Sequence, residues 1–454
     1  MKLDKLTYTN LIVIGISLST VFILIYNILY FNPILGYDAE AHYAYINYLS
    51  RYLPRDFRLP PMNETREFFN PPVGYLVPSI AQVICRNVIE SSDFLSDCQP
   101  YYGKVTQVFQ SFMYIATIFI NLVTLKSINN SNKLINVSYL ILISLLAVNY
   151  RTISMIRGEP YILFFMSIFL YLIYKHEKSG FEFNFKYIFY TGLVIGAIAL
   201  SRQWGFLLFL PLIYLYFFKE FNLKYLKLWS LCATIGAALS SWFYIDLYRR
   251  YGSFTAFNHD FYGFSFSNQN FNFYVPNYEQ IVYLFTKPIR PHLNNQFVSI
   301  LYSDLWGDYW GYFTFTSRFL DIGRNQLLIG DYFARVNIIS IFTTLLIITF
   351  CFFAYRANKQ KFIIQYLNKA ILFSFFGYLV FAIAYPDWTG DTIKSTYIIQ
   401  LFHLAVFLAS IYFSKLEEMN KKVFNTLITI LFLIYVHNFQ TYLSHFPLNY
   451  YYYP

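Results

Sequence analysis

The sequence predicts an all-α integral membrane protein with about 11 transmembrane helices and two large outer-face loops that contain interfacial helices. Composition is the first observation behind this prediction. Of the 454 residues, 57% are hydrophobic and 13% are charged, with a mean hydropathy of +0.41, whereas soluble globular proteins carry about 25% charged residues. The second observation is the spacing of long apolar runs, and the third is the placement of lysine and arginine between them.

The first apolar run, from Leu11 to Phe31, follows Lys2 and Lys5. It is longer than the roughly 7–15-residue apolar core of a cleaved signal peptide, and no small-residue cleavage site follows it. We therefore expect an anchor that is retained, with the N-terminus in the cytoplasm.

A helix needs about 20 apolar residues to cross a bilayer. The expected spans lie at roughly 9–31, 106–125, 134–150, 160–174, 187–201, 204–218, 228–247, 336–355, 368–385, 396–414 and 423–440. If the N-terminus is cytoplasmic, the alternate connections are short and each carries lysine or arginine, at 126–133, 175–186, 219–227, 356–367 and 415–422. This agreement with the positive-inside rule supports the assignment.

The whole chain, 1–454, is thus predicted to be a single polytopic membrane domain. Residues 32–105 form the first outer loop and residues 248–335 the second, both rich in aromatic residues and proline. Within the first loop, segment 73–89 is apolar enough to enter the membrane interface. Its internal proline and arginine argue against a full span, which leaves 12 or 13 crossings as the alternative count.

The net charge of +10 is explained by lysines in the cytoplasmic loops, so no nucleic-acid partner is expected. The four cysteines include no CxxC pair and no spacing typical of zinc sites. Cys232 and Cys351 lie in apolar runs and are expected to be core residues. Cys85 and Cys98 share one loop, where they either form a disulfide on an oxidising face or remain free.

Four cations interrupt short outer connections, which are expected to be poor in positive charge. Arg151 and Arg157 lie in the 149–160 connection, Arg202 in the tight 201–204 turn, and Lys394 in the 386–396 connection. Charges near membrane depth are costly and often functional, although single cations also reach out to lipid headgroups. Because Arg202 has almost no flanking loop, its guanidinium is expected close to the protein interior. A cluster of this kind suits a lipid-linked phosphate or diphosphate.

The segment "DAEAHYAYINYLSRYL" directly after the first span is predicted to be a helix with Asp38 as its N-cap. At about 100° per residue, Asp38 and His42 share one helix face, whereas Glu40 points nearly the opposite way. We rank Asp38 first, His42 second and Glu40 third as catalytic candidates. A carboxylate here can take the proton of an acceptor hydroxyl, while basic side chains stabilise a departing phosphate.

Other outer residues suit a sugar site. In "LYSDLWGDYWGYF", Asp304 and Asp308 are candidates for binding sugar hydroxyls, and Trp306, with the second tryptophan of this motif, for stacking on sugar rings. An aromatic belt with loop-capping aspartates is the alternative. Glu159 begins a membrane helix and either caps it, pairs with the neighbouring arginine or binds substrate. Tyr397 lies one helical turn from Lys394, so both can touch one headgroup.

Together these segments resemble the polytopic glycosyltransferases of the GT-C class, which includes protein O-mannosyltransferases and the aminoarabinose transferase acting on lipid A. The resemblance covers most of the chain and depends on the order and sidedness of "YDAEAHYAYINYL", "FNPPVGYL", "SRQWGFLLFLP", "SDLWGDYWGYF" and "GDTIKSTY". It implies inverting transfer from a polyprenyl- or dolichyl-phosphate sugar, with an acid of the first outer loop at the active site. That acid corresponds to Asp38 or Glu40, and the donor phosphate meets Arg202 or Lys394. Many members have adjacent acids, whereas Ala39 separates them here, which leaves the role of Glu40 and metal dependence open.

The predicted function is transfer of a sugar from a polyprenyl-phosphate donor to a hydroxyl or amine of a lipid, glycan or protein acceptor. We expect this on the periplasmic or extracellular face of a bacterial plasma membrane, with no required cofactor and no metal-ligand cluster; a divalent cation is the alternative. A flippase or transporter for lipid-linked glycans fits less well, because transporters place charges near the bilayer midplane within related repeats. An O-antigen ligase or polymerase also fits less well, because those proteins carry their large loop late in the chain.

Overall fold

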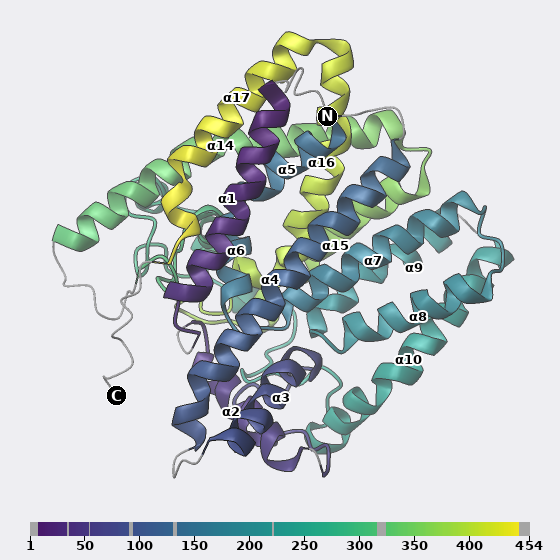
Figure 1. Ribbon diagram of the computed structural model, residues 1–454, viewed down its shortest axis with the longest axis vertical. Helices are drawn as coiled ribbons and strands as arrows, with labels where there is room; N and C mark the ends of the chain where they lie inside the picture. The colour runs from purple at the N-terminus through teal and green to yellow at the C-terminus, as the bar shows by residue number, and fades with distance from the viewer. Residues whose placement is uncertain are drawn as a thin grey trace. The chain divides into compact units, whose positions relative to one another are not determined.

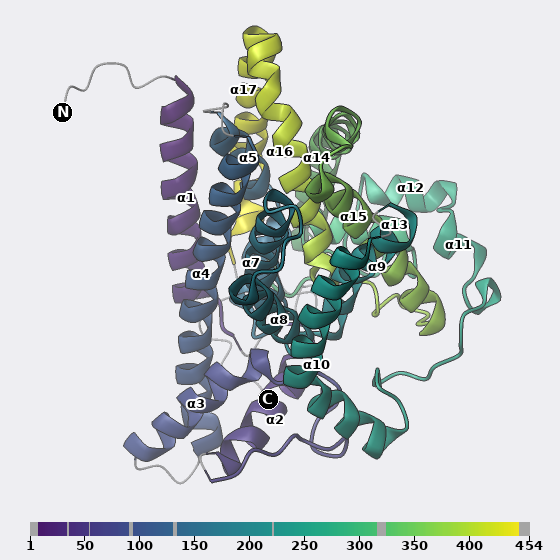
Figure 2. The same cartoon turned by 90° about the vertical axis from the view of Figure 1, so that its right-hand side faces the viewer.

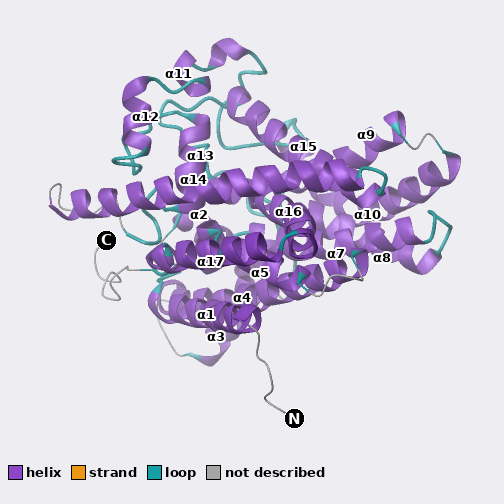
Figure 3. Cartoon of the chain, turned by 90° about the horizontal axis from the view of Figure 1, so that it is seen from above, coloured by secondary structure: helices purple, strands orange, loops and turns teal. Residues whose placement is uncertain are grey.

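The protein consists of helices joined by loops, which confirms the all-α prediction (Figure 3). The computed structural model describes residues 8–33, 36–53, 55–89, 94–129, 134–219, 222–315 and 324–444. Parts of the expected connections, such as 130–133, 220–221 and 316–323, lie outside the described residues. The chain divides into two compact units. Unit 1 comprises Met1–Tyr30, Asn121–Arg151 and Phe261–Pro454, and unit 2 comprises Phe31–Ile120 and Thr152–Asp260.

The described part of the chain contains six helices that are long and apolar enough to cross a membrane, at Leu11–Tyr30, Cys98–Ile128, Leu223–Tyr251, Ile329–Asn358, Phe362–Ala384 and Ser395–Met419. The chain is therefore a multi-pass integral membrane protein, and its described residues contain fewer full-length spans than the expected eleven. The other expected spans fall on shorter or more charged helices. α7 (Glu159–Lys178) has 20 residues but begins on a glutamate and ends among lysines, α8 (Phe185–Ala199) has 15, α9 (Leu210–Phe218) has 9 and α17 (Lys421–His437) has 17.

The span expected at 134–150 is a broken helix, which corrects the sequence prediction. α5 (Ile135–Ser144) and α6 (Ala147–Ser154) form a pair bent by 66° that counts as a seventh span if the two are taken together. At the break, the Asn149 side-chain amide donates a 3.0 Å hydrogen bond to the Ile143 carbonyl oxygen, so a carbonyl freed by the bend keeps a partner. Arg151 consequently lies on α6 and not in a loop.

In unit 2, α8 and α10 (Leu223–Tyr251) lie side by side (Figures 1 and 2). Their contact depends on small residues. A Cβ atom added at Gly192 would lie 2.5 Å from Ile235 Cβ, and one added at Gly236 would lie 2.5 Å from Ile195 Cγ2. Glycine at these positions lets the two backbones approach, as is common between membrane helices. α7 packs on the same α8, and η1 (Gln203–Leu208) joins α8 to α9.

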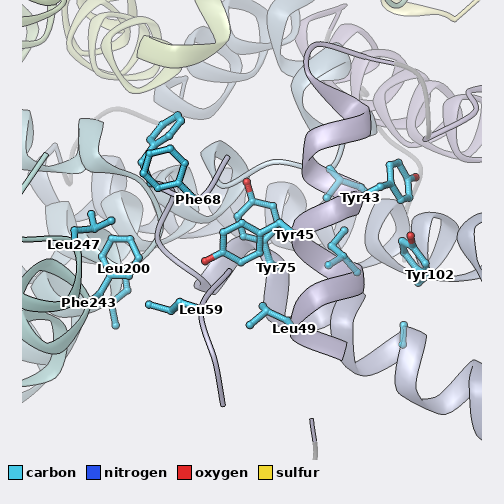
Figure 4. Packing of buried hydrophobic residues seen from close by; sticks show 14 of the residues in the cluster. Tyr43, Tyr45, Leu49, Leu59, Phe68, Tyr75, Tyr102, Leu200, Phe243 and Leu247 are labelled. Carbon is cyan, nitrogen blue, oxygen red and sulfur yellow. The ribbon is translucent and has the colours of Figure 1, made fainter. Parts of the chain in front are cut away.

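The first loop adds α2 (Ala39–Tyr52) and α3 (Val73–Val88) to unit 2. These helices pack together around Tyr45 and Tyr75, whose rings stack with centroids 4.0 Å apart (Figure 4). α3 has 16 residues and is not among the spans, in agreement with the prediction for 73–89. A disulfide between Cys85 and Cys98 joins α3 to α4 (Phe94–Ile128), so the pairing that the sequence left open is present.

In unit 1, α16 (Ile399–Met419) is surrounded by α5, α14, α15 and α17 and is the most enclosed of the described spans. Because helices pack against α16 on several sides, most of its surface is buried, whereas the other spans expose large apolar faces. The remaining elements of this unit are α1 (Tyr8–Tyr30), α11 (Phe271–Tyr274), α12 (Tyr278–Leu284), α13 (Phe297–Trp306), α14 (Arg324–Asn358), α15 (Phe362–Ala384), η2 (Phe266–Asn268), η3 (Ser395–Ile398) and η4 (Phe439–Tyr442).

Candidate functional site

A buried network of charged side chains surrounds Arg202 in unit 2; we call Glu67, Asn70, Arg157, Glu159 and Arg202 the Arg202 network. Nε and Nη2 of Arg202 both lie 3.0 Å from Oε1 of Glu159, and Nη1 lies 3.6 Å from Oε2 of Glu67. Arg202 also donates to the Asn70 side-chain oxygen, and Asn70 donates to Glu67. The expectation that the Arg202 guanidinium lies in the protein interior is confirmed, since its side chain is buried.

Arg157 connects this network to the start of the first loop. Its Nη1 lies 3.8 Å from Oε1 of Glu159, which confirms that Glu159 pairs with the neighbouring arginine. Its Nη2 donates a 3.1 Å hydrogen bond to the Tyr37 carbonyl oxygen, and its guanidinium carbon lies 4.9 Å from the centroid of the Tyr37 ring. Arg157 thus fixes the residue that immediately precedes Asp38.

Glycines allow the segments that carry the network to meet. A Cβ atom at Gly158 would lie 2.3 Å from the Ser201 carbonyl oxygen, and one at Gly74 would lie 2.9 Å from Gly158 Cα. Both distances are shorter than van der Waals contact, so only glycine lets these backbones approach. The close approach brings Arg157 and Glu159, on either side of Gly158, to the turn that carries Arg202.

Asp38 occupies the N-cap position of α2, as expected, but its side chain does not cap the helix. Its backbone has φ 53° and ψ 23°, in the left-handed region, and its side chain makes no capping hydrogen bond. Oδ1 of Asp38 lies 3.8 Å from Nη2 of Arg66. The Asp38 side chain is 22% exposed and the Arg66 side chain 67%. Asp38 is therefore an accessible carboxylate on a conformation that L-residues rarely adopt, a feature found often at functional sites.

His42 lies on α2, is buried, and contacts the Arg202 network. Its Nδ1 is 2.7 Å from the Tyr75 hydroxyl and 3.9 Å from Oε2 of Glu67. Asn70 also donates to the Tyr75 hydroxyl, at 3.1 Å. Burial raises the pKa of Tyr75 well above its ordinary value, with the Glu67 carboxylate adding to the effect, so the phenol stays protonated. Glu40, in the same helix, is exposed.

A second group of charges lies in unit 1, around Arg151. Its Nη2 is 3.0 Å from Oδ1 of Asp304 and its Nη1 is 3.6 Å from Oδ1 of Asp308, with all three side chains buried. Asp304 Oδ2 also accepts hydrogen bonds from the backbone N–H and the hydroxyl of Ser395, at 2.8 and 2.6 Å. Asp308 Oδ2 accepts hydrogen bonds from the backbone N–H groups of Phe313 and Thr314, both at 2.8 Å. This is the loop-capping role that the sequence analysis gives as the alternative to sugar binding. Burial raises the pKa of Asp308, and Arg151 opposes that shift.

Lys394 is buried beside aromatic rings in the same unit. Its Nζ lies 3.3 Å from Oδ1 of Asp391, whose side chain is 42% exposed, and 3.5 Å from the Tyr397 hydroxyl. The structure therefore brings Lys394 and Tyr397 together as the sequence predicted. Nζ also lies 5.8 Å from the centroid of the Trp310 ring, within cation–π range.

The tryptophans expected to stack on sugars are enclosed by protein. Trp306 is 1% exposed and Trp310 is fully buried. The Trp306 indole N–H donates to the Thr344 hydroxyl and that of Trp310 to the Ile393 carbonyl oxygen, both at 3.0 Å. Both rings are packing residues in this structure, and sugar stacking stays a prediction.

The sequence prediction did not include Glu67, Asn70 and Tyr75. Asn70 and Tyr75 lie within "FNPPVGYL", which enters the sequence analysis only as one segment of the resemblance, and Glu67 lies two residues before it. An acid and an amide beside a run of aromatic residues and prolines is the sequence pattern that indicates these site residues. The prediction also treated Arg151, Arg157 and Arg202 as phosphate ligands, whereas here each is paired with a buried carboxylate.

Among the described residues, no three His, Cys, Asp or Glu side chains form a group that could hold a metal ion. The absence of a metal requirement stays a prediction.

The fold defines a class: a polytopic helical membrane protein with a GT-C-like arrangement of helices. The chain is similar to the oligosaccharyltransferase of Archaeoglobus fulgidus in its apo form, with a TM-score of 0.52 and 14% identity. It is also similar to AglB from the same organism in complex with an inhibitory peptide and a dolichol-phosphate, with a TM-score of 0.51 and 14% identity. In both comparisons 99% of this chain is covered, and it spans 57% of the length of the other. No family model and no curated protein matches the sequence.

Proposed function

We propose that this protein is a membrane glycosyltransferase that moves a sugar from a polyprenyl-phosphate donor to an acceptor hydroxyl or amine, with inversion at the anomeric carbon. The observation that carries the proposal is Asp38. It is a partly exposed carboxylate in a left-handed backbone conformation, placed between the first span and α2 on a GT-C-like fold. The acceptor, whether lipid, glycan or protein, binds next to it.

In this reaction the acceptor oxygen or nitrogen attacks the anomeric carbon, and the bond from that carbon to the phosphate oxygen breaks. Asp38 takes the acceptor proton as the general base, a role that contributes roughly 10²–10⁴-fold. Its carboxylate is suited to this role because it is accessible and its contact with Arg66 is a long one, 3.8 Å, to an exposed side chain. The departing phosphate carries away the bonding electrons and needs a cation.

Lys394 is the cation that we assign to the donor phosphate, with Tyr397 beside it. Its ammonium is buried among aromatic rings, and its partner Asp391 is partly exposed, so a phosphate can replace that carboxylate. Arg157 and Arg202 are assigned a positioning role, because each is buried against Glu159 and together they hold the segment before Asp38. Arg151 holds Asp304 and Asp308 in the same way.

The donor class is supported by the comparison with AglB, whose structure contains a dolichol-phosphate and an inhibitory peptide. Dolichol-phosphate and polyprenyl-phosphate each carry a phosphate at the end of a long hydrocarbon chain. Both therefore hold the phosphate at the membrane surface while the chain lies in the bilayer. The periplasmic or extracellular face is proposed as the side of the reaction. The Cys85–Cys98 disulfide supports this, because disulfides persist in oxidising compartments.

Purified protein with labelled polyprenyl-phosphate sugars and a membrane extract as acceptor source tests the proposal. We expect labelled product from the wild type and a loss of at least about 100-fold in Asp38→Asn. Glu64→Gln is the matched control, since Glu64 is an exposed acid of the same loop paired with Arg51. Turnover by Asp38→Asn equal to that of the control would exclude Asp38 as the base. Uptake of unchanged lipid-linked sugar into sealed vesicles would instead favour a flippase.

A further inference from the structure

A pocket with basic and aromatic walls lies where α10 ends in unit 2. Its volume is about 550 Å³. α10 contributes Trp242, Ile245, Asp246, Arg249 and Arg250, and the facing wall comes from α2 and from segment 57–61 of the first loop. We call this the Arg249 pocket.

The two walls of the Arg249 pocket are fixed to each other. Arg250 Nη1 donates a 3.2 Å hydrogen bond to the Leu59 carbonyl oxygen, and the Met62 N–H donates to the Tyr251 hydroxyl at 3.0 Å. The ring of Phe57 meets the ring of Trp242 edge to face, with centroids 5.7 Å apart. The pocket is therefore built by tertiary contacts across the chain and does not depend on a ligand to form.

The charge of the pocket favours an anion. Arg250 pairs with Asp246 at 3.0 Å, and Arg58, the third guanidinium of the lining, pairs with Asp56 at 2.6 Å. Arg249 forms no ion pair with any residue that the structure describes. The Arg249 guanidinium is therefore available to bind a ligand. The carboxylates that pair with Arg58 and Arg250 are themselves partly exposed. Arginine offers a planar fork that matches phosphate oxygens.

The position of the pocket favours a lipid over a soluble anion. α10 is long and apolar enough to span the membrane from Leu223 to Tyr251, and the pocket occupies its last turns. Trp242 and Ile245, which line the pocket, are 41% and 42% exposed. An aliphatic group about one turn before the clustered arginines and an aromatic group about two turns before them match the order of headgroup and acyl chain at a membrane surface.

We propose that the Arg249 pocket binds the phosphate headgroup of an anionic membrane lipid. Arg249 and Arg58 donate to the phosphate oxygens, and the upper part of an acyl chain lies along Trp242 and Ile245. This site goes beyond the proposed sugar transfer. Its occupancy is measurable without any turnover.

Native mass spectrometry of the purified full-length protein tests the site, with dioleoyl-phosphatidylglycerol and dioleoyl-phosphatidylcholine as probes. Wild-type protein is expected to retain the glycerol lipid in preference to the choline lipid. Arg249→Gln and, separately, Arg58→Gln should weaken that retention by about tenfold, the effect of losing one charge-assisted contact. Arg55→Gln is the matched control, because Arg55 is an exposed cation of the same segment that does not line the pocket.

Equal weakening in Arg55→Gln would overturn the proposal, because the effect would then be one of general surface charge. Retention unchanged in both Arg249→Gln and Arg58→Gln would overturn it as well. Displacement of the lipid by inorganic phosphate at equal concentration would point to a soluble anion as the ligand. Thermal melting of each variant shows whether it is folded. If Arg249→Gln does not fold, Arg58→Gln still tests the proposal.

Discussion

Arg202 and Glu159 form a buried ion pair across 43 residues of sequence, with Nε and Nη2 of the arginine each 3.0 Å from the same carboxylate oxygen. The pair holds the turn after α8 against the start of α7. It also fixes the position of Arg157, which in turn holds the residue before Asp38. The local architecture around Asp38 within unit 2 thus depends on this contact.

Breaking the pair should be strongly destabilising. We expect Arg202→Ala to lower the free energy of unfolding by about 3–5 kcal/mol, because Glu159 is left as a buried charge without its main partner. The exposed pair between Arg51 and Glu64, with side chains 49% and 36% exposed, is the matched comparison. Arg51→Ala should cost about 1 kcal/mol or less. Denaturant unfolding in detergent measures both, and equal losses in the two variants would contradict a central role for the buried pair.

Gly158→Ala should destabilise the protein by about 1–3 kcal/mol, because overpacking forces neighbouring groups apart. The added Cβ would lie 2.3 Å from a backbone oxygen of Ser201, which cannot rotate away as a side chain would. Gly15→Ala in α1 is the control, since a Cβ there meets nothing within 4 Å. Its melting temperature should be unchanged or higher. A melting temperature of Gly158→Ala equal to that of the wild type would show that these segments do not meet as described.

The disulfide predicts a definite count of free thiols. Denatured, unreduced protein should react with maleimide at two of its four cysteines, Cys232 and Cys351, and at all four after reduction. Cys85→Ser should lower the free energy of unfolding by about 3 kcal/mol, the effect of releasing a loop of roughly this length. Cys351→Ser keeps the disulfide and serves as the control. Four labelled thiols before reduction would rule the disulfide out.

Sidedness is testable with single cysteines in a background without Cys232 and Cys351. Arg66→Cys in the first loop and Trp388→Cys in the 386–396 connection replace exposed side chains, 67% and 84% exposed. Both are expected to react with a membrane-impermeant maleimide added to intact cells. Lys178→Cys, in an expected cytoplasmic connection, should react only after permeabilisation. If Arg66→Cys and Trp388→Cys react from opposite sides, a shared reaction involving Asp38 and Lys394 is excluded.

The sequence predicted the features that depend on local composition and periodicity. An all-helical membrane protein, the helix that begins after Asp38 and the exclusion of segment 73–89 from the full-length spans follow from hydropathy and spacing. The GT-C-like fold was implied by the resemblance in the order of the motifs. The pairing of Arg157 with Glu159 could also be anticipated, because the two residues are neighbours in sequence. The number of full-length spans could not, because several apolar runs form helices that are too short, and one run breaks between Ser144 and Ala147.

What the sequence determined by itself is where apolar and charged residues occur along each helix, since hydropathy and helical period are properties of short segments. Only the tertiary structure decided which charges meet. Asn70 reaches Arg202 across 132 residues, and Arg151 reaches the carbonyl of Asp304 across 153. A buried charge is stable only beside a partner, and which partner is within reach depends on backbones brought together by packing, as at Gly158 and Ser201.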